Sequence, residues 1–238
     1  MDKFLIVRTG GTFPDYARKR KDFEHWTAEG MGLADGQWLC VDVQAGEPLP
    51  DPAGFAGAAM TGSHDMVTDG MQWIHDTKAW VCRAVDAGLP LLGICFGHQL
   101  MADALGGEAG YHPDGVEIGT ADITLTAEAG ADPLLVGLPA VFKGHVTHSQ
   151  TALRVPPGAA LLATGTHDPH QCFRVGEHAW GVQFHPEFDA DAIRHYIDMR
   201  EADLLQEGCD VTGIRATVCD TPESASLLVR FVEYCRKR

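Results

Sequence analysis

Short apolar runs alternate with stretches of helical spacing in the first half of the chain. The runs at 3–7 (KFLIV) and 38–43 (WLCVDV) predict buried strands, and the small-residue run at 53–62 predicts a strand that ends in a glycine turn. The continuous apolar run at 89–94 (LPLLGI) is typical of a strand buried on both faces of a parallel sheet. Residues 8–26 have poor periodicity and predict a loop that leads into a short helix. The whole stretch 8–37, with Phe13, Tyr16 and a basic run at 18–21, is expected either to frame a substrate or a partner or to be a solvated surface loop.

Two helices are predicted around the run at 89–94. Apolar residues recur at helical spacing through 69–88, and Gly88 with the nearby Pro90 fits the end of that helix. Residues 97–107 predict a second helix, which the glycine pair at its end stops. Strands that alternate with helices in this way predict an α/β domain with a mostly parallel sheet flanked by helices.

The pattern changes after residue 110. Strand-like runs with hairpin-scale gaps predict that antiparallel strands extend the parallel sheet; they cover 116–126, 159–166, 170–175 and 178–184. The C-terminal residues, from about 189 to 238, predict extra helices. One spans 189–208 with Ile193, Tyr196, Ile197 and Leu204 on one face. Another begins after Thr221, with Pro222 in its first turn.

Composition limits the class of protein. The chain has 238 residues without a repeat or linker, so we expect a single domain over 1–238. No run approaches the about 20 apolar residues of a membrane span, and the N-terminal apolar segment is too short for a signal peptide. The net charge of −15 opposes binding to nucleic acid or anionic membranes. Seven cysteines without paired spacing predict a reducing, cytoplasmic location.

One of these cysteines has a distinctive setting. Cys95 lies in the segment GICFGHQ, between Gly93 and Gly97, where the predicted strand meets the predicted helix. A strand, a sharp turn and a helix with glycines two residues either side form the pattern of a nucleophile elbow. The thiol would stand above the carboxyl end of the strand, and the N–H groups of the helix would favour its thiolate form. A buried core cysteine beside incidental glycines is the alternative interpretation.

A thiolate nucleophile needs a general base and a group that orients the base. The segment GVQFHPEF (181–188) offers both, because His185 follows an apolar strand and Glu187 lies two residues further, beyond a proline. Residues two apart in an extended segment point the same way, so Glu187 can hold one imidazole nitrogen while the other faces Cys95. His145, His148, His167 and His170 do not have the spacing of a usual zinc site, and we expect no metal.

Together, GICFGHQ and GVQFHPE resemble the class I glutamine amidotransferases, the family that includes the glutaminase domain of GMP synthetase. The resemblance covers roughly residues 38–188 and implies a flavodoxin-like α/β fold. It implies Cys95 as nucleophile, His185 as general base and acid, and Glu187 as the carboxylate that orients it. The segment MTGSH (60–64) corresponds to the family's oxyanion turn but has serine and histidine where the family has a second glycine and a proline.

The same resemblance implies the remaining site residues. The backbone of Phe96 would supply one oxyanion donor, and that of Gly62 or Ser63 the other. Gln99 would line the substrate pocket, and the segment THSQ would lie near the amino-acid end of the substrate, with Thr147, His148 and Ser149. His98, beside Gln99, is expected to pack beneath the elbow.

The implied activity is hydrolysis of the glutamine side-chain amide through a γ-glutamyl thioester on Cys95, without a cofactor. Because no phosphate-binding loop for ATP is present, the ammonia would pass to a synthetase on a separate chain. A free-standing hydrolase of γ-glutamyl amides or peptides and a non-catalytic regulatory module of the same fold are the alternatives. A papain-like protease is excluded, since its cysteine opens a helix near the mature N-terminus.

Overall fold

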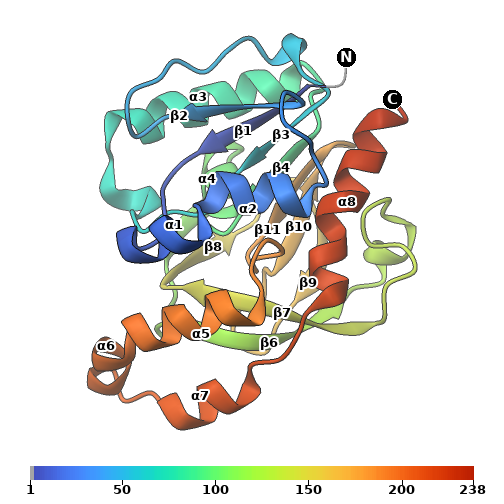
Figure 1. The fold of residues 1–238 in the computed structure, drawn as a ribbon. Helices are drawn as coiled ribbons and strands as arrows, with labels where there is room; N and C mark the ends of the chain where they lie inside the picture. The colour runs from blue at the N-terminus through green and yellow to red at the C-terminus, as the bar shows by residue number, and fades with distance from the viewer. Residues whose placement is uncertain (1–2) are drawn as a thin grey trace.

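The computed structural model describes residues 3–238, which form a layered α/β structure around a nine-stranded sheet (Figure 1). In spatial order the strands are β2 (Trp38–Asp42), β1 (Phe4–Arg8), β3 (Gly57–Met60), β4 (Leu91–Ile94), β11 (Ala179–Val182), β10 (Cys172–Val175), β9 (Ala160–Thr164), β6 (Glu117–Leu125) and β7 (Val141–His148). The pairs from β2 to β11 are parallel, and all pairs from β11 to β7 are antiparallel. The predicted parallel sheet with an antiparallel extension is therefore confirmed.

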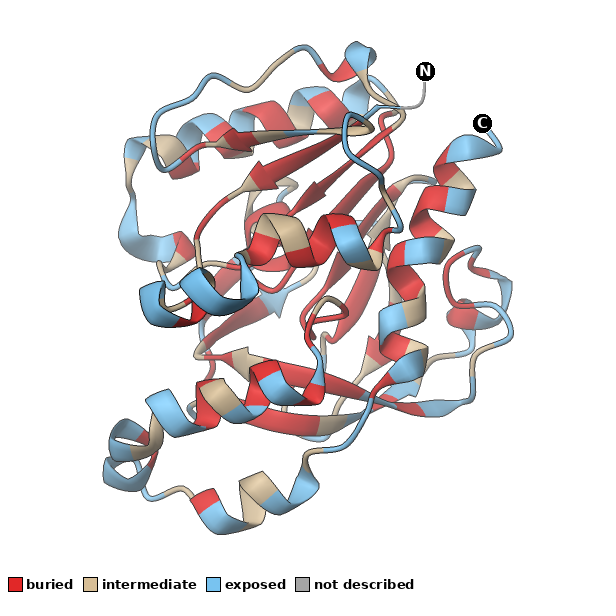
Figure 2. Cartoon of the chain, in the orientation of Figure 1, coloured by how far each residue is buried: buried red, intermediate tan, exposed pale blue. Residues whose placement is uncertain are grey.

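Both faces of the parallel half are buried. Phe4 and Leu5 are neighbours in β1 but belong to different apolar cores, because successive side chains of a strand point to opposite faces. Helices α3 (Gln72–Asp86) and α4 (Phe96–Ala104) pack on one face, and helices α2 (Phe23–Gly30) and α8 (Pro222–Arg236) pack on the other. This arrangement explains the continuous apolar runs, since a strand covered on both sides has no face for polar residues. Figure 2 shows these strands buried along most of their length.

The predicted ends of three helices agree with the structure. Helix α3 ends at Asp86, and Gly88 beyond it has a φ of +70°. Helix α4 ends before Gly106, which has a φ of +92°. Both glycines occupy the left-handed region that commonly ends helices. Helix α8 begins at Pro222 after Thr221, although the Thr221 side chain makes no capping hydrogen bond.

A small ribbon and three short turns complete the sheet layers. Strand β5 (Glu108–Tyr111) pairs antiparallel with β8 (Gln150–Arg154), and this ribbon packs against α4. The 3₁₀ turns are η1 (Pro52–Gly54), η2 (Val67–Asp69) and η3 (Glu128–Ala131). Strand β7 was not predicted. It pairs with β6 along eight residues, although its sequence, VFKGHVTH, contains a glycine and three charged or imidazole side chains.

A third apolar cluster joins the two ends of the chain. Trp26 of α2 and Phe188, Tyr196 and Leu204 meet in it. Its elements are α2 together with α1 (Pro14–Arg20), α5 (Ala190–Met199), α6 (Glu201–Gln206) and α7 (Val211–Thr217). Figure 1 shows the first helices lying near α5 although they are distant in sequence.

Two predictions in this region are wrong in detail. Residues 8–37 contain two helices, α1 and α2, instead of a loop that leads into one. The single helix predicted over 189–208 is broken at Arg200, which has φ −102° and ψ 4°. The spacing of apolar residues did not reveal this break, because Ile193 before it and Leu204 after it contact the same apolar cluster. Helix α7 was not predicted separately.

None of the helices between residues 3 and 238 combines the length and apolar character of a membrane-spanning helix. All seven cysteines have free thiols.

Candidate active site

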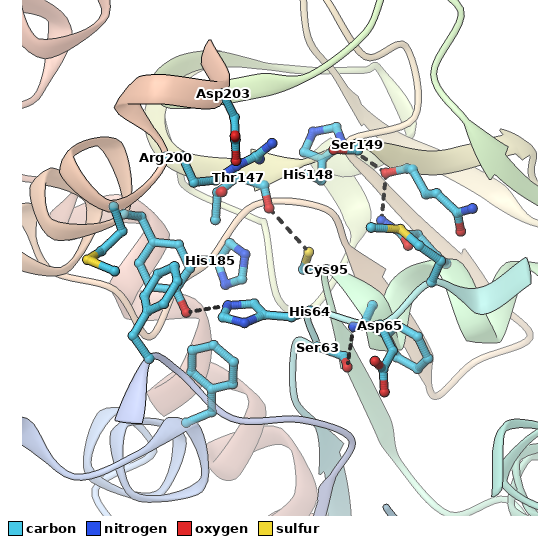
Figure 3. Close-up of a pocket in the computed structure, with 18 residues that line it drawn as sticks. Ser63, His64, Asp65, Cys95, Thr147, His148, Ser149, His185, Arg200 and Asp203 are labelled. Carbon is cyan, nitrogen blue, oxygen red and sulfur yellow. Dashed lines mark hydrogen bonds between the residues drawn. The ribbon is translucent and has the colours of Figure 1, made fainter. Parts of the chain in front are cut away.

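Cys95 lies at the turn between β4 and α4. Its φ is +51° and its ψ is −100°, and Lys21 is the only other non-glycine residue with a positive φ among residues 3–238. A conformation of this kind costs about 1–3 kcal/mol and persists where the surrounding structure enforces it. In Figure 3 the sulfur of Cys95 points into a pocket rather than into the apolar core. The structure thus has the geometry of a nucleophile elbow at the predicted cysteine.

The backbone after Cys95 can stabilise negative charge. Phe96 is the first residue of α4, so its N–H has no acceptor within the helix. The first N–H groups of a helix also carry the positive end of the helix dipole. The thiol itself lies 3.8 Å from the carbonyl oxygen of Thr147, to which it can donate a weak hydrogen bond.

His185 reaches the same place from a neighbouring strand. Strand β11 is paired in parallel with β4, with Val182 opposite Ile94, so the residues that follow each strand emerge side by side. The Nδ1 atom of His185 lies 2.8 Å from Oε1 of Glu187, whose side chain is fully buried. The His185 ring also stacks on Phe188, with 4.2 Å between ring centroids. The carboxylate and the aromatic ring together fix the orientation of the imidazole.

The electrostatic setting favours the protonated form of this imidazole. Burial lowers the pKa of His185, but the negative charges of Glu187 and Cys95 outweigh it and raise the pKa to about 10. The Nε2 atom is buried without a regular hydrogen-bond partner among the described residues. Part of the negative charge that raises the pKa of His185 is that of the Cys95 sulfur. The arrangement therefore suits a thiolate–imidazolium pair.

The oxyanion turn predicted at 60–64 has one peptide held in place by two hydroxyls. The Oγ1 atoms of Thr61 and Thr9 lie 3.1 and 3.2 Å from the carbonyl oxygen of Gly62. Because a trans peptide is planar, the N–H of Ser63 points in the opposite direction from this carbonyl. Ser63 lines the pocket, whereas Gly62 is not among the lining residues. Of the two predicted donors, the geometry favours the N–H of Ser63.

There is nevertheless little room for a side chain at position 62. A Cβ atom at this position would lie 3.2 Å from Cε1 of His185 and 3.8 Å from Cβ of Cys95. The contact with the imidazole is tighter than nine in ten real Cβ contacts, so a larger residue would press against His185. The glycine in MTGSH thus lets the turn lie close to the side chains of both Cys95 and His185.

The pocket above Cys95 has a volume of about 330 Å³. It is lined by all the predicted substrate contacts, which are Gln99, Thr147, His148 and Ser149, and by Cys95, Phe96 and His185. Gln99 is held from below, because its Nε2 donates to the carbonyl of Gln150 at 2.7 Å and contacts Oε1 of Gln183 at 3.2 Å. Its side chain is therefore a fixed part of the pocket wall.

His148 is unsuited to act as a second base. Its Nδ1 lies 2.9 Å from the carbonyl oxygen of Gln150, and its Nε2 lies 2.8 Å from Oε2 of Glu117. Both ring nitrogens are therefore engaged by neighbouring oxygens, and neither is free to take a proton from a substrate. His148 is a fixed part of the pocket wall.

The other histidines considered at the outset have structural settings. His98 is fully buried beneath the elbow, with its ring 4.7 Å from that of Phe173, and burial lowers its pKa to about 4. His145 contacts the Thr120 hydroxyl at 3.0 Å. Within residues 3–238 no three His, Cys, Asp or Glu side chains are grouped as metal ligands would be.

Comparison with known proteins agrees with this geometry. The family model described as "Glutamine amidotransferase class-I" matches residues 63–200, a span that includes Cys95, His185 and Glu187. The chain belongs to the class I glutamine amidotransferase family. Family membership confirms the expectation of an enzyme that hydrolyses carbon–nitrogen amide bonds.

Two kinds of curated relative resemble this amidotransferase chain. It is 37% identical over 150 residues to GMP synthase [glutamine-hydrolyzing] of Aeropyrum pernix, covering 63% of the chain and 26% of that protein. It is 30% identical over 173 residues to Gamma-glutamyl peptidase 4 of Arabidopsis thaliana, covering 71% of the chain and 68% of that protein. The chain thus spans about a quarter of the length of the GMP synthase but two thirds of the peptidase.

Solved structures share the amidotransferase fold. A glutamine amidotransferase from Thermotoga maritima superposes with a TM-score of 0.75 over 100% of both chains at 18% identity. One from Methylobacillus flagellatus also gives a TM-score of 0.75, over 98% of this chain and 95% of that chain at 21% identity.

Several pocket residues of this amidotransferase were not predicted from the sequence. They are His64, of the oxyanion segment, and Tyr196, Met199, Arg200 and Asp203, of the α5–α6 region. Phe13 and Phe23 also line the pocket and belong to the segment 8–37, which was expected to frame a substrate or a partner. The third apolar cluster brings the N-terminal helices and α5–α6 to the pocket mouth. The sequence indicated only part of this arrangement. The amphipathic helix that directly follows HPE has to begin beside the site, but no residue pattern indicated that the helix breaks at Arg200.

Proposed function

We propose that this chain hydrolyses the side-chain amide of glutamine to glutamate and ammonia through a thioester on Cys95. The observation that carries the proposal is the meeting of a cysteine in a strained turn with an imidazole bonded at 2.8 Å to a buried carboxylate. A nucleophile, a base and a group that orients the base are the parts that covalent acyl transfer needs. We also propose that residues 1–238 act as one domain whose C-terminal helices complete the pocket.

In the first half of the reaction, the Cys95 thiolate attacks the amide carbon of glutamine. The carbonyl oxygen takes up negative charge and is stabilised by the N–H groups of Phe96 and Ser63. Loss of one such donor typically costs about a hundredfold or more in rate. The His185 imidazolium then gives its Nε2 proton to the amide nitrogen, the carbon–nitrogen bond breaks, and ammonia leaves a γ-glutamyl thioester.

In the second half, His185 acts as the base. It accepts a proton from water, the resulting hydroxide attacks the thioester carbon, and the same two N–H groups stabilise the second oxyanion. The carbon–sulfur bond breaks, glutamate is released and Cys95 returns to the thiolate. Glu187 keeps Nδ1 protonated throughout, so that only Nε2 exchanges protons. These steps use no cofactor.

The fate of the ammonia separates two versions of this function. In the first, it passes to a synthetase on a separate chain, which is supported by similarity to the glutaminase part of GMP synthase. In the second, the chain is a free-standing hydrolase of γ-glutamyl amides or peptides, which is supported by similarity over two thirds of Gamma-glutamyl peptidase 4. We propose the first as the main function and keep the second as the alternative that the similarity to the peptidase supports.

The test is to incubate the purified chain with L-glutamine or with γ-glutamyl dipeptides and to measure glutamate release. Release from glutamine by the chain alone, and none by Cys95→Ala, supports glutaminase chemistry. Release only after addition of a second protein supports the synthetase partner, whereas preferential cleavage of the dipeptides supports the free-standing hydrolase. If wild-type protein releases no glutamate and a glutamine-like electrophile does not modify Cys95, the proposal is wrong.

A further inference from the structure

Two charged residues line the pocket without a structural task. Arg200, at the break between α5 and α6, and Asp203, in the first turn of α6, both border the space above Cys95. In Figure 3 they enter from the side of Thr147 and His148, opposite Ser63 and Asp65. Neither was predicted as a site residue, and Asp203 lies beyond the span that the family model matches.

Arg20 and Arg215, in the same layer, form close ion pairs, but the less exposed Arg200 does not. Arg20 contacts Asp189 and Asp191 at 2.6 and 2.8 Å, and Arg215 contacts Asp198 at 2.7 Å. The guanidinium of Arg200 makes no hydrogen bond within residues 3–238. Its one carboxylate neighbour, Glu207, lies at 4.0 Å, the limit of an ion pair. Only 23% of the Arg200 side chain is exposed, so this cation is largely withdrawn from water without a close partner.

Asp203, which is exposed, also has no partner in the part of the chain that the structure describes. Its carboxylate makes no hydrogen bond or ion pair with any residue from 3 to 238, although the N–H of Glu207 bonds its backbone carbonyl. It stands three residues after Arg200, a spacing that places two side chains on the same side of a helical turn. The pocket wall therefore presents a free cation and a free anion next to each other.

The positive charge of Arg200 affects another residue that lines the pocket. Burial lowers the pKa of His64, and the positive charge of Arg200 lowers it further. His64 belongs to the oxyanion segment and lines the pocket as well. The guanidinium therefore acts on the interior of the cavity and not only on the solvent around α6.

From these observations we infer that Arg200 and Asp203 bind the amino-acid end of the substrate, with Arg200 contacting the α-carboxylate and Asp203 the α-ammonium group. The inference rests on the proposed function, because it assumes a glutamyl group whose amide carbon is at Cys95. Both charged groups of glutamine are attached to one carbon, separated from the amide carbon by two methylenes. A guanidinium is well suited to a carboxylate because it can donate two parallel hydrogen bonds.

Two amides that each lack one charged group of glutamine separate the roles. Glutaramate lacks the α-ammonium, and γ-aminobutyramide lacks the α-carboxylate. Arg200→Met should lower kcat/KM for L-glutamine and glutaramate about ten- to hundredfold, as expected for a lost charged hydrogen bond, and leave γ-aminobutyramide within about twofold. Asp203→Asn should lower it for L-glutamine and γ-aminobutyramide and spare glutaramate. The effects should appear mainly in KM, since the contacts are made equally in the ground and transition states.

Arg194→Met is the matched control, because Arg194 lies exposed on α5, makes no ion pair in the described part of the chain and does not line the pocket. It should change none of the three activities. A loss in Arg200→Met that is equal for all three amides would overturn the inference, as would no loss at all. A loss confined to γ-glutamyl dipeptides would place Arg200 on the leaving-group side and would also overturn it.

A readout that needs no turnover keeps this result separate from the proposed function. A diazoketone analogue of glutamine, which carries the amino-acid end, should alkylate Cys95 about ten- to hundredfold more slowly in Arg200→Met than in wild type. Iodoacetamide, which lacks that end, should react equally with both. Equal rates with the diazoketone overturn the inference while leaving the proposed function intact. A wild-type Cys95 that the diazoketone does not modify, in a protein that releases no ammonia, overturns both.

Discussion

Gly93 and Gly97 are packed backbone against backbone around Cys95. A Cβ atom at Gly93 would lie 2.6 Å from both the carbonyl carbon and the carbonyl oxygen of Gly97. A Cβ atom at Gly97 would lie 2.8 Å from the carbonyl oxygen of Met60 on the neighbouring strand. The last residues of β4 and the first turn of α4 can approach this closely only without side chains, and this contact holds Cys95 in its positive-φ conformation.

We predict that Gly93→Ala destabilises the protein by about 1–3 kcal/mol, the usual cost of forcing extra atoms into a packed region, and lowers the reactivity of Cys95. The colliding atoms are backbone atoms, which cannot move aside without opening the turn. Urea unfolding and the rate of alkylation by iodoacetamide would measure the two effects. Gly130→Ala is the control, because a Cβ there has no heavy atom within 4 Å. Equal stability of the two variants would contradict the packing argument.

Replacing Cys95 should separate catalysis from backbone strain. Cys95→Ala and Cys95→Gly should both lose glutamine hydrolysis by about a thousandfold or more, as removal of a nucleophile typically does. Cys95→Gly should be about 1 kcal/mol more stable than Cys95→Ala, because glycine adopts a φ of +51° with little strain. Ammonia release and thermal unfolding provide the measurements. Hydrolysis within tenfold of wild type in either variant would remove the nucleophile assignment.

The reactivity of Cys95 should persist to high pH and depend on Glu187. The pKa of His185 in the folded protein is about 10, above its ordinary value of 6.5. The imidazole is therefore protonated at neutral pH and loses its proton only as the pH rises toward 10. The rate of glutamine hydrolysis should therefore fall only as pH approaches 10. The stabilisation of the folded state by the charged imidazole should be complete below pH 6.5 and should decline steadily from there until the pH reaches about 10.

Glu187→Gln tests the cause of this shift. Removing the carboxylate leaves burial, which lowers the pKa of His185, opposed mainly by Cys95. The high-pH limb of the rate profile should move to lower pH and kcat should fall. Glu177→Gln is a suitable control, since Glu177 is exposed and far from the pocket lining. An unchanged limb in Glu187→Gln would show that Glu187 does not set the protonation of His185.

The sequence was most informative where one local pattern determined the structure. Buried strands such as β4 and β11 appear as continuous apolar runs, and Cys95 is marked by glycines that its turn requires. His185 and Glu187 could be paired from spacing alone, because they lie two residues apart at the end of a strand. These features are local, so neighbouring residues were sufficient to identify them.

The rest depended on contacts between distant segments. Phe13 and Tyr196, 183 positions apart, meet at the pocket mouth with ring centroids 5.0 Å apart. Nothing in either local sequence specifies the other as its partner. The break at Arg200 is equally hidden, since both helices that it separates keep apolar residues on the third cluster. The choice of Ser63 over Gly62 as oxyanion donor required the peptide orientation, which residue types do not encode.

That orientation leads to a last prediction. The hydroxyl of Thr61 lies 3.1 Å from the Gly62 carbonyl and accepts the N–H of Thr9 at 3.0 Å, so it links the oxyanion turn to β1. Thr61→Val keeps the shape but removes both contacts and leaves the Gly62 carbonyl with only the Thr9 hydroxyl, at 3.2 Å. The peptide between Gly62 and Ser63 is then held less firmly and can rotate its N–H away from the pocket more often. We expect kcat for glutamine hydrolysis to fall about tenfold or more. An oxyanion donor typically raises the rate about a hundredfold, and a donor that points away from the pocket part of the time gives less of this acceleration. Some stability should also be lost, since the buried N–H of Thr9 is left without an acceptor.

Thr27→Val is the control for this substitution. Thr27 is equally buried, but its hydroxyl has no partner among the described residues, so replacing it with a methyl group should leave kcat unchanged and should not destabilise the protein. Both variants should be assayed at saturating glutamine, well below their unfolding temperatures, so that a loss of folded protein is not mistaken for slower chemistry. If Thr61→Val retained kcat within twofold of Thr27→Val, the Thr61 hydroxyl would not be needed to orient the second oxyanion donor. The role assigned to Thr61 would then have to be abandoned.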